Sequence, residues 1–239
     1  MDQKRKYLLT ALTILVILVG ILVIFKRTKS LTPNFPQNSS VGKERALNVG
    51  KGQDSNVEVS EGSRKVKGLQ DAPITILEFS DFQCPSCKGA QEPLRVLSEK
   101  FPKLIQIHFK HFPLSMHRFS MDAAVFSECA ADQGRFWPYA DLLFSEQDNW
   151  SRDPDAPFLF VAYANSLGLD RSKLEQCVNQ PEAEKSVEAD RAQGQAQQIN
   201  STPTFFINGE RVVGGKQLAD EGPNIIQKKL ELLVSHKKS

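Results

Sequence analysis

The sequence predicts an α/β fold that is interrupted by an inserted helical domain and preceded by one N-terminal transmembrane helix. Three observations predict it. An uncharged apolar run covers residues 8–25. A strand, a helix and a second strand then follow one another over residues 74–112. A long series of helical patterns, residues 117–200, separates them from a closing hairpin and helix.

The first apolar run has the length of a membrane anchor. Its 18 residues contain no charge, and as a helix they would span roughly 27 Å, close to the hydrocarbon thickness of a bilayer. The run is followed by Lys-Arg-Thr-Lys, which offers no small-residue cleavage site. We therefore expect an uncleaved anchor in residues 1–29, with a cleaved signal peptide as the alternative.

The charge of the chain is distributed unevenly. The net charge is +2, but six cations and one anion lie around the anchor, which leaves 24 positive and 27 negative charges in the rest. A mildly acidic domain has no electrostatic footprint for nucleic acid, so nucleic-acid binding is excluded as a function. Residues 30–65 are polar, rich in Gly, Pro, Ser and Asn, and predict a flexible tether. A short strand near residues 57–59 or 64–67 remains an alternative within it.

The chemistry of the sequence centres on Cys84-Pro85-Ser86-Cys87. A β-branched, apolar strand, residues 74–79, runs into this motif, and a helical pattern follows it. Pro85 suits the first position of a helix, because its missing N–H and fixed φ are no handicap there. Cys84 is then placed at the helix N-terminus, where free N–H groups and the macrodipole favour a thiolate.

Two simpler interpretations of the C-x-x-C pair are a zinc half-site and a structural disulfide. A zinc site built from four cysteines normally shows a second C-x-x-C, and Cys129 and Cys177 stand alone. No metal site is therefore expected. A strand followed by C-x-x-C and a helix is typical of thioredoxin-like redox proteins, and this interpretation is favoured.

The remaining elements follow from apolar periodicity and from proline and glycine at their ends. Asn208-Gly209 between two apolar runs is a strong hairpin signal. We expect a thioredoxin-like domain in residues 66–116 and 199–236 and an inserted helical domain in residues 117–198. The expected strands are 74–79, 104–112, 204–207 and 211–213, and the expected helices after the one that begins at Cys84 are 121–130, 136–144, 158–167, 170–177, 181–198 and 217–234.

Four segments together resemble one family. EFSDFQCPSC, KHFPL, ECAADQGRFWPYADLLF and STPTFFINGERVVGG are similar, in order and spacing, to the DsbA-like thiol-disulfide oxidoreductases of the membrane-anchored bacterial branch. The resemblance covers residues 71–234. It implies a thioredoxin fold with a helical insert, with Cys84 as the exposed, attacked cysteine and Cys87 as the buried resolving one. Pro85 and Ser86 between them would tune the pair.

The resemblance assigns roles to five further residues. Thr202-Pro203 resembles the cis-proline loop that faces the C-x-x-C pair and binds substrate; an ordinary trans turn is the alternative. Cys129 and Cys177 would form a structural disulfide in the insert, against the alternative of two free buried cysteines. Glu78 would be a buried acid beneath the active site that relays protons for Cys87, with Lys110 as a candidate partner. A solvent-facing strand carboxylate is the alternative for Glu78, and the histidines are expected to be structural.

The function expected from these features is that of an extracytoplasmic thiol-disulfide oxidoreductase. The protein would be anchored in the cell membrane through residues 8–25, use no cofactor and act as a monomer. Its partners would be reduced or unfolded exported proteins and a membrane quinone-linked reoxidase. The alternatives are a reductase or isomerase of the same fold, or a non-catalytic chaperone or binding module.

Overall fold

We analysed a computed structural model of the protein, which describes residues 64–236. Its elements begin with a short strand at residues 66–68, close to the alternative strand at 64–67, and then confirm the predicted order of strand, helix, strand, helical block, hairpin and helix. They are β1 (Val66–Gly68), β2 (Ile74–Ser80), α2 (Pro85–Lys100), β3 (Ile105–His111), α3 (Ser120–Ala131), α4 (Phe136–Ser145), α5 (Gln147–Trp150), α6 (Ala156–Ser166), α7 (Arg171–Val178), α8 (Pro181–Ala196), β4 (Thr204–Ile207), β5 (Glu210–Val213) and α9 (Gly214–His236).

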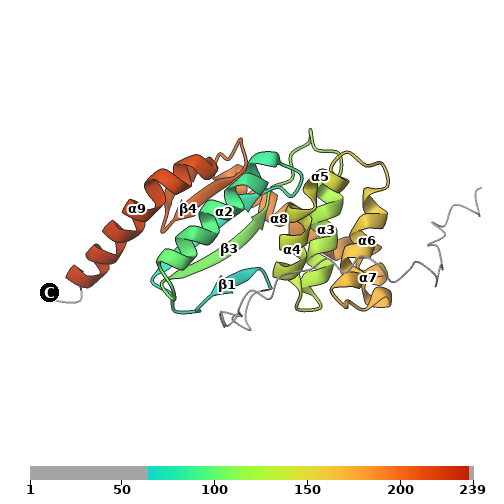
Figure 1. Ribbon diagram of the computed structural model, residues 1–239, viewed down its shortest axis with the longest axis horizontal. Helices are drawn as coiled ribbons and strands as arrows, with labels where there is room; N and C mark the ends of the chain where they lie inside the picture. The colour runs from blue at the N-terminus through green and yellow to red at the C-terminus, as the bar shows by residue number, and fades with distance from the viewer. Residues whose placement is uncertain (1–63, 237–239) are drawn as a thin grey trace, which may run out of the picture. The chain divides into compact units, whose positions relative to one another are not determined.

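The strands form one mixed sheet in the order β1-β3-β2-β4-β5. The central strands β2 and β3 are parallel, and the other pairs are antiparallel. Because parallel neighbours need a crossover, α2 connects β2 to β3 and lies over the sheet (Figure 1). The predicted hairpin is β4–β5, with Asn208 and Gly209 both at positive φ in its turn.

Alternation along β2 divides the core into two parts. Even-numbered residues such as Ile74 and Ile76 pack under α2 and α9, which lie side by side on that face (Figure 1). Odd-numbered residues point to the opposite face, where Phe79 packs with Phe112 and Ile199. Glu78 therefore belongs to the face that α2 covers, directly beneath the helix that carries the cysteines.

The helices α3 to α8 all lie between β3 and β4 in the sequence and group together beside the sheet (Figure 1). They contain the short helix α5, which the sequence patterns do not predict. The start of the described chain also contacts them. Lys65, which the predicted tether includes, has its ammonium group between the carboxylates of Glu128 in α3 and Asp190 in α8.

That ammonium group belongs to a buried ionic cluster. Glu128 is 1% exposed and lies 3.1 Å from His111 Nε2, and Lys110 Nζ reaches Asp190 at 3.0 Å. Burial raises the pKa of Glu128, but the hydrogen bond with His111 and the charge of Lys65 outweigh it and hold the pKa at about 2. The cluster joins β3, α3 and α8 with Lys65, the residue directly before β1.

The predicted anchor, residues 8–25, and most of the predicted tether lie outside the described residues. Within residues 64–236, no helix is long and apolar enough to cross a bilayer.

Candidate active site

The two cysteines of the C-x-x-C motif lie where β2 passes into α2. Cys84 is the N-cap residue of α2, with extended φ and ψ, and Pro85 occupies the first helical position, as predicted. The Cys84 carbonyl accepts the first helical hydrogen bonds, from Cys87 N at 3.0 Å and Lys88 N at 3.2 Å. Neither sulfur is bridged in this structure, so the pair is in its reduced form.

The pKa values of the two thiols are shifted in opposite directions. The pKa of Cys84 falls from its ordinary value to about 5, first because the Cys87 thiol hydrogen-bonds to it, and further because of Thr202 and the backbone N–H groups of Cys87 and Ser86. Burial raises the pKa of Cys87 well above its ordinary value, and the hydrogen bond with Cys84 adds to the rise. Cys84 is therefore a thiolate near neutral pH, and Cys87 holds its proton.

Both cysteines are buried, which corrects the expectation of an exposed Cys84. Cys84 is 7% exposed and Cys87 is completely covered. The cover over Cys84 includes the loop before β4, because Thr202 O lies 3.5 Å from Cys84 Sγ.

The Thr202–Pro203 peptide bond is cis, as predicted. Thr202 is 8% exposed, and its side chain interacts with both active-site sulfurs. Its hydroxyl is one of the groups that lower the pKa of Cys84. The loop thus contributes directly to the electrostatics of the nucleophile.

Glu78 is buried beneath α2, as predicted, but its expected partner was wrong. Lys110 binds Asp190 instead, because β3 directs that side chain toward α8. Glu78 accepts a hydrogen bond of 2.9 Å from Gln91 Nε2, which also lies 3.3 Å from the Cys87 carbonyl. Burial raises the pKa of Glu78 to about 7, although the Gln91 hydrogen bond opposes the rise.

Asp81, which the sequence analysis did not single out, organises the loop between β2 and α2. Its carboxylate accepts hydrogen bonds from Ser120 Oγ at 2.6 Å and from His117 Nδ1 at 2.6 Å, and also from the backbone N–H groups of Gln83 and Leu114. Its own N–H donates to Cys87 Sγ at 3.4 Å. An Asp three residues before a cysteine is a common loop residue, so only its burial distinguishes it.

Two glutamines join this loop to the helical block. Gln83 Nε2 donates to Ser151 O at 2.7 Å, and Gln83 Oε1 accepts from Phe119 N at 2.6 Å. Gln147 Nε2 donates to Phe82 O at 2.6 Å and to Cys84 O at 3.0 Å. A pocket of about 450 Å³ opens beside Cys84 and is lined by residues that include Gln83, Pro85 and Gln147.

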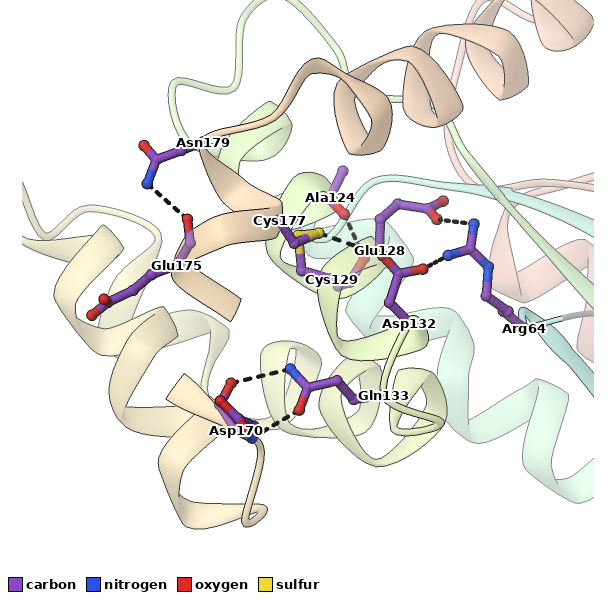
Figure 2. Close-up of a disulfide and its surroundings, with 11 residues drawn as sticks. Arg64, Ala124, Glu128, Cys129, Asp132, Gln133, Asp170, Glu175, Cys177 and Asn179 are labelled. Carbon is purple, nitrogen blue, oxygen red and sulfur yellow. Dashed lines mark hydrogen bonds and ion pairs between the residues drawn. A yellow bond between two sulfur atoms is a disulfide. The ribbon is translucent and has the colours of Figure 1, made fainter. Parts of the chain in front are cut away.

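The other two cysteines form a disulfide, as predicted. Cys129 in α3 and Cys177 in α7 are bridged across 48 positions of the sequence (Figure 2). Below the bridge, the Gln133 side chain exchanges two hydrogen bonds with the backbone of Asp170 (Figure 2). The bridge therefore ties α3 to α7 inside the helical block, and it is separate from the Cys84–Cys87 pair.

A thiolate of low pKa, a neighbouring buried thiol and a cis-proline loop over both are the parts that thiol–disulfide exchange requires. The class of protein defined by this fold and site is the thiol-disulfide oxidoreductases. The comparisons with known proteins agree. A family model described as thioredoxin matches residues 60–228, and the chain belongs to that family.

Solved structures show which members of the thioredoxin family this chain is similar to. BdbD from Bacillus subtilis, in its oxidised form, is 27% identical, with a TM-score of 0.61 over 70% of this chain and 92% of that one. Wolbachia pipientis alpha-DsbA1 shares the fold, with a TM-score of 0.63 at 23% identity over 72% of this chain and 93% of that one. The protein is thus a DsbA-like member of the thioredoxin family.

A curated relative matches over a shorter segment. The Na(+)/H(+) antiporter NhaA 3 of Salinispora tropica is 32% identical over 147 residues, which are 61% of this chain and 22% of that protein. The chain therefore spans about a fifth of that relative's length, and the likeness is to one part of it.

Proposed function

We propose that this protein is an extracytoplasmic oxidase that introduces disulfide bonds into exported proteins. The observation that carries the proposal is the pKa of Cys84, lowered to about 5 beside a Cys87 thiol of raised pKa. A stabilised Cys84 thiolate favours the reduced enzyme, and an enzyme that favours its reduced form is a strong oxidant of other thiols.

The reaction begins from the enzyme with a Cys84–Cys87 disulfide. A substrate thiolate attacks Cys84 Sγ and forms a mixed disulfide, and Cys87 leaves as a thiolate and takes up a proton. A second substrate thiolate then attacks the substrate sulfur of the mixed disulfide and expels Cys84 as a stable thiolate. Two electrons pass from the substrate dithiol to the enzyme, and a membrane quinone-linked partner would remove them to restore the disulfide.

Glu78 supplies the proton that Cys87 needs. Its carboxyl lies beneath α2, and Gln91 connects it with the Cys87 backbone. With a pKa of about 7 the group is present in both protonation states near neutral pH, which suits a proton relay. Pro85 and Ser86 tune the Cys84 thiolate, through the helix start and a backbone N–H respectively.

The loop at Thr202-Pro203 would bind the substrate backbone next to Cys84. Thr202 O already lies 3.5 Å from Cys84 Sγ, so a substrate cysteine bound to Cys84 would lie beside this loop. Because β4 itself is paired on both sides, with β2 and with β5, an extended substrate chain would pair with the backbone of the loop that precedes it. The substrates would be reduced or unfolded polypeptides.

An oxidising compartment is the setting that suits this chemistry. The Cys129–Cys177 bridge supports it, because structural disulfides persist outside the cytosol. In this proposal residues 8–25 anchor the protein in the cell membrane, and residues 30–65 hold the domain away from it, where it acts as a monomer.

The test is the equilibrium reduction potential of Cys84–Cys87 in a glutathione buffer. A potential of about −200 mV or higher is expected for the oxidase. A value near −270 mV, roughly that of thioredoxin, would overturn the proposal in favour of a reductase. The Cys84→Ser variant is the control: if it retains full activity on reduced proteins, the chain is a binding module and no oxidase.

A further inference from the structure

Gln147 joins a helix of the insert to the active-site loop. It belongs to the short helix α5, which lies beside the beginning of α2 (Figure 1). The side chain is 2% exposed, and its amide nitrogen donates to Phe82 O at 2.6 Å and to Cys84 O at 3.0 Å. Both N–H groups of one side-chain amide are thus used on the loop that holds the nucleophile.

The two carbonyls differ in their other hydrogen bonds. They flank Gln83, whose own side chain is occupied with Ser151 and Phe119. The Cys84 carbonyl also accepts the first two helical N–H groups, whereas the only hydrogen bond to the Phe82 carbonyl in residues 64–236 comes from Gln147. A buried carbonyl without a donor is costly, so the loop conformation depends on this amide.

The conformation of this loop decides where the Cys84 sulfur lies. The backbone N–H groups of Ser86 and Cys87 stabilise the Cys84 thiolate. Hydrogen bonds of this kind weaken steeply when their angles open, so a small rotation of Cys84 removes part of their effect. A donor that fixes the Phe82 and Cys84 carbonyls, which belong to the peptide groups before Gln83 and after Cys84, therefore acts on the sulfur without touching it.

We propose that Gln147 is a positioning residue for thiol–disulfide exchange, through which the helical insert holds the Cys84 sulfur under the N–H donors that stabilise its anion. The inference deepens the proposed function and rests on it only in taking Cys84 as the attacked cysteine. The insert is then part of the redox machinery as well as a cover over the sheet.

The test replaces Gln147 by residues of similar size. Gln147→Met keeps the volume and removes both donors, and Gln147→Glu keeps the shape and places an acceptor against two carbonyls. We expect either change to raise the midpoint of Cys84 ionisation by about one pH unit, equivalent to tenfold less thiolate below the midpoint. The reduction potential then falls by about 30 mV, since a tenfold change in this two-electron equilibrium corresponds to that value.

Trp150→Phe is the matched control. Trp150 lies on the same helix, is fully buried, and donates from Nε1 to Leu143 O at 2.8 Å, away from the active-site loop. We expect this variant to lose stability and to keep the wild-type ionisation midpoint. A Gln147→Met protein that is folded but has an unchanged midpoint would overturn the inference, as would an equal shift in the control.

Failure of the inference and failure of the proposed function give different results. A wild-type potential near that of thioredoxin contradicts the oxidase proposal whatever Gln147 does. Unchanged ionisation in the Gln147 variants of a strongly oxidising protein contradicts the positioning role alone. The variants are measured in the complete chain, with circular dichroism to establish that each is folded.

Discussion

Cys84 and Thr202 are separated by 118 positions in the sequence, yet the Thr202 carbonyl oxygen lies 3.5 Å from the Cys84 sulfur. The contact brings the start of α2 against the loop that precedes β4. Because β4 pairs antiparallel with β2, with Phe79 opposite Thr204, the sheet itself sets this approach. The active site is therefore assembled from two segments, one of which precedes the helical block in the sequence while the other follows it.

The first prediction concerns the reactivity of Cys84. With a pKa of about 5, the thiolate of the reduced protein is lost only as the pH falls below that value. The rate of alkylation by iodoacetamide should be nearly constant above about pH 6 and decline below pH 5, whereas an ordinary thiol becomes reactive near pH 8.5. Cys84→Ser should abolish the fast phase. A rate that still climbs between pH 6 and 8 would contradict the lowered pKa.

The second prediction concerns the Thr202 hydroxyl. Thr202→Val keeps the shape of the side chain and removes a buried donor that acts on Cys84. The midpoint of Cys84 ionisation should rise by about one pH unit, because a hydrogen bond to a charged group contributes roughly 1.5 kcal/mol or more. The ultraviolet absorbance of the thiolate, followed as a function of pH, measures this midpoint. Thr202→Ser, which retains the hydroxyl, should stay close to the wild type.

The third prediction concerns the buried acid. Burial raises the pKa of Glu78 from 4.5 to about 7, so the folded protein keeps a proton that the unfolded chain releases. The contribution of the protonated Glu78 carboxyl to the free energy of unfolding is fully present below about pH 4.5 and is lost as the pH rises through 7. Glu78→Gln avoids that loss.

This variant should therefore be more stable than the wild type near pH 8, by up to roughly 3 kcal/mol, and no more stable near pH 4. Urea unfolding at the two pH values measures the difference. An equal gain at both pH values would show that the effect is not due to ionisation. If Glu78 also relays protons, disulfide exchange by the variant should be slower at neutral pH.

The fourth prediction concerns the bridge in the insert. Cys129 and Cys177 are 48 positions apart, and the chain-entropy model gives about 4 kcal/mol of stabilisation for a loop of that length. The double variant with both residues changed to Ala should lose about this free energy of unfolding. Both the double variant and its reference protein should lack Cys84 and Cys87, so that the active-site pair does not affect the measured difference. The loss should disappear when both proteins are measured in reductant.

The fifth prediction concerns Gly194 in α8, which packs closely against two aromatic rings. A Cβ there would lie 2.6 Å from the Phe112 ring and 3.1 Å from the Phe79 ring. Gly194→Ala should destabilise the protein by about 1–3 kcal/mol through overpacking. Gly89, in α2, has no atom within 4 Å of a Cβ position. Gly89→Ala should instead be neutral or stabilising by up to about 1 kcal/mol, through helix propensity.

Local patterns predicted most of the fold. A β-branched apolar run identified β2, and alternating apolar residues identified β3. Asn208-Gly209 identified the β4–β5 hairpin, and Pro85 marked the first turn of α2. These signals are visible in the sequence because they arise from neighbours along the chain. The short helix α5 has too few residues for a period, so no pattern could reveal it.

By itself the sequence determined the chemistry of the two cysteines and their order on a helix start, since C-x-x-C spacing and Pro85 act locally. The resemblance of four segments added the cis-proline loop and the Cys129–Cys177 pairing. Only the tertiary structure decided that Cys84 is covered, that Glu78 pairs with Gln91 while Lys110 pairs with Asp190, and that Gln147 holds the active-site loop. Burial and partners depend on which distant segments the sheet and helices bring together, and that long-range packing leaves no periodic trace in the sequence.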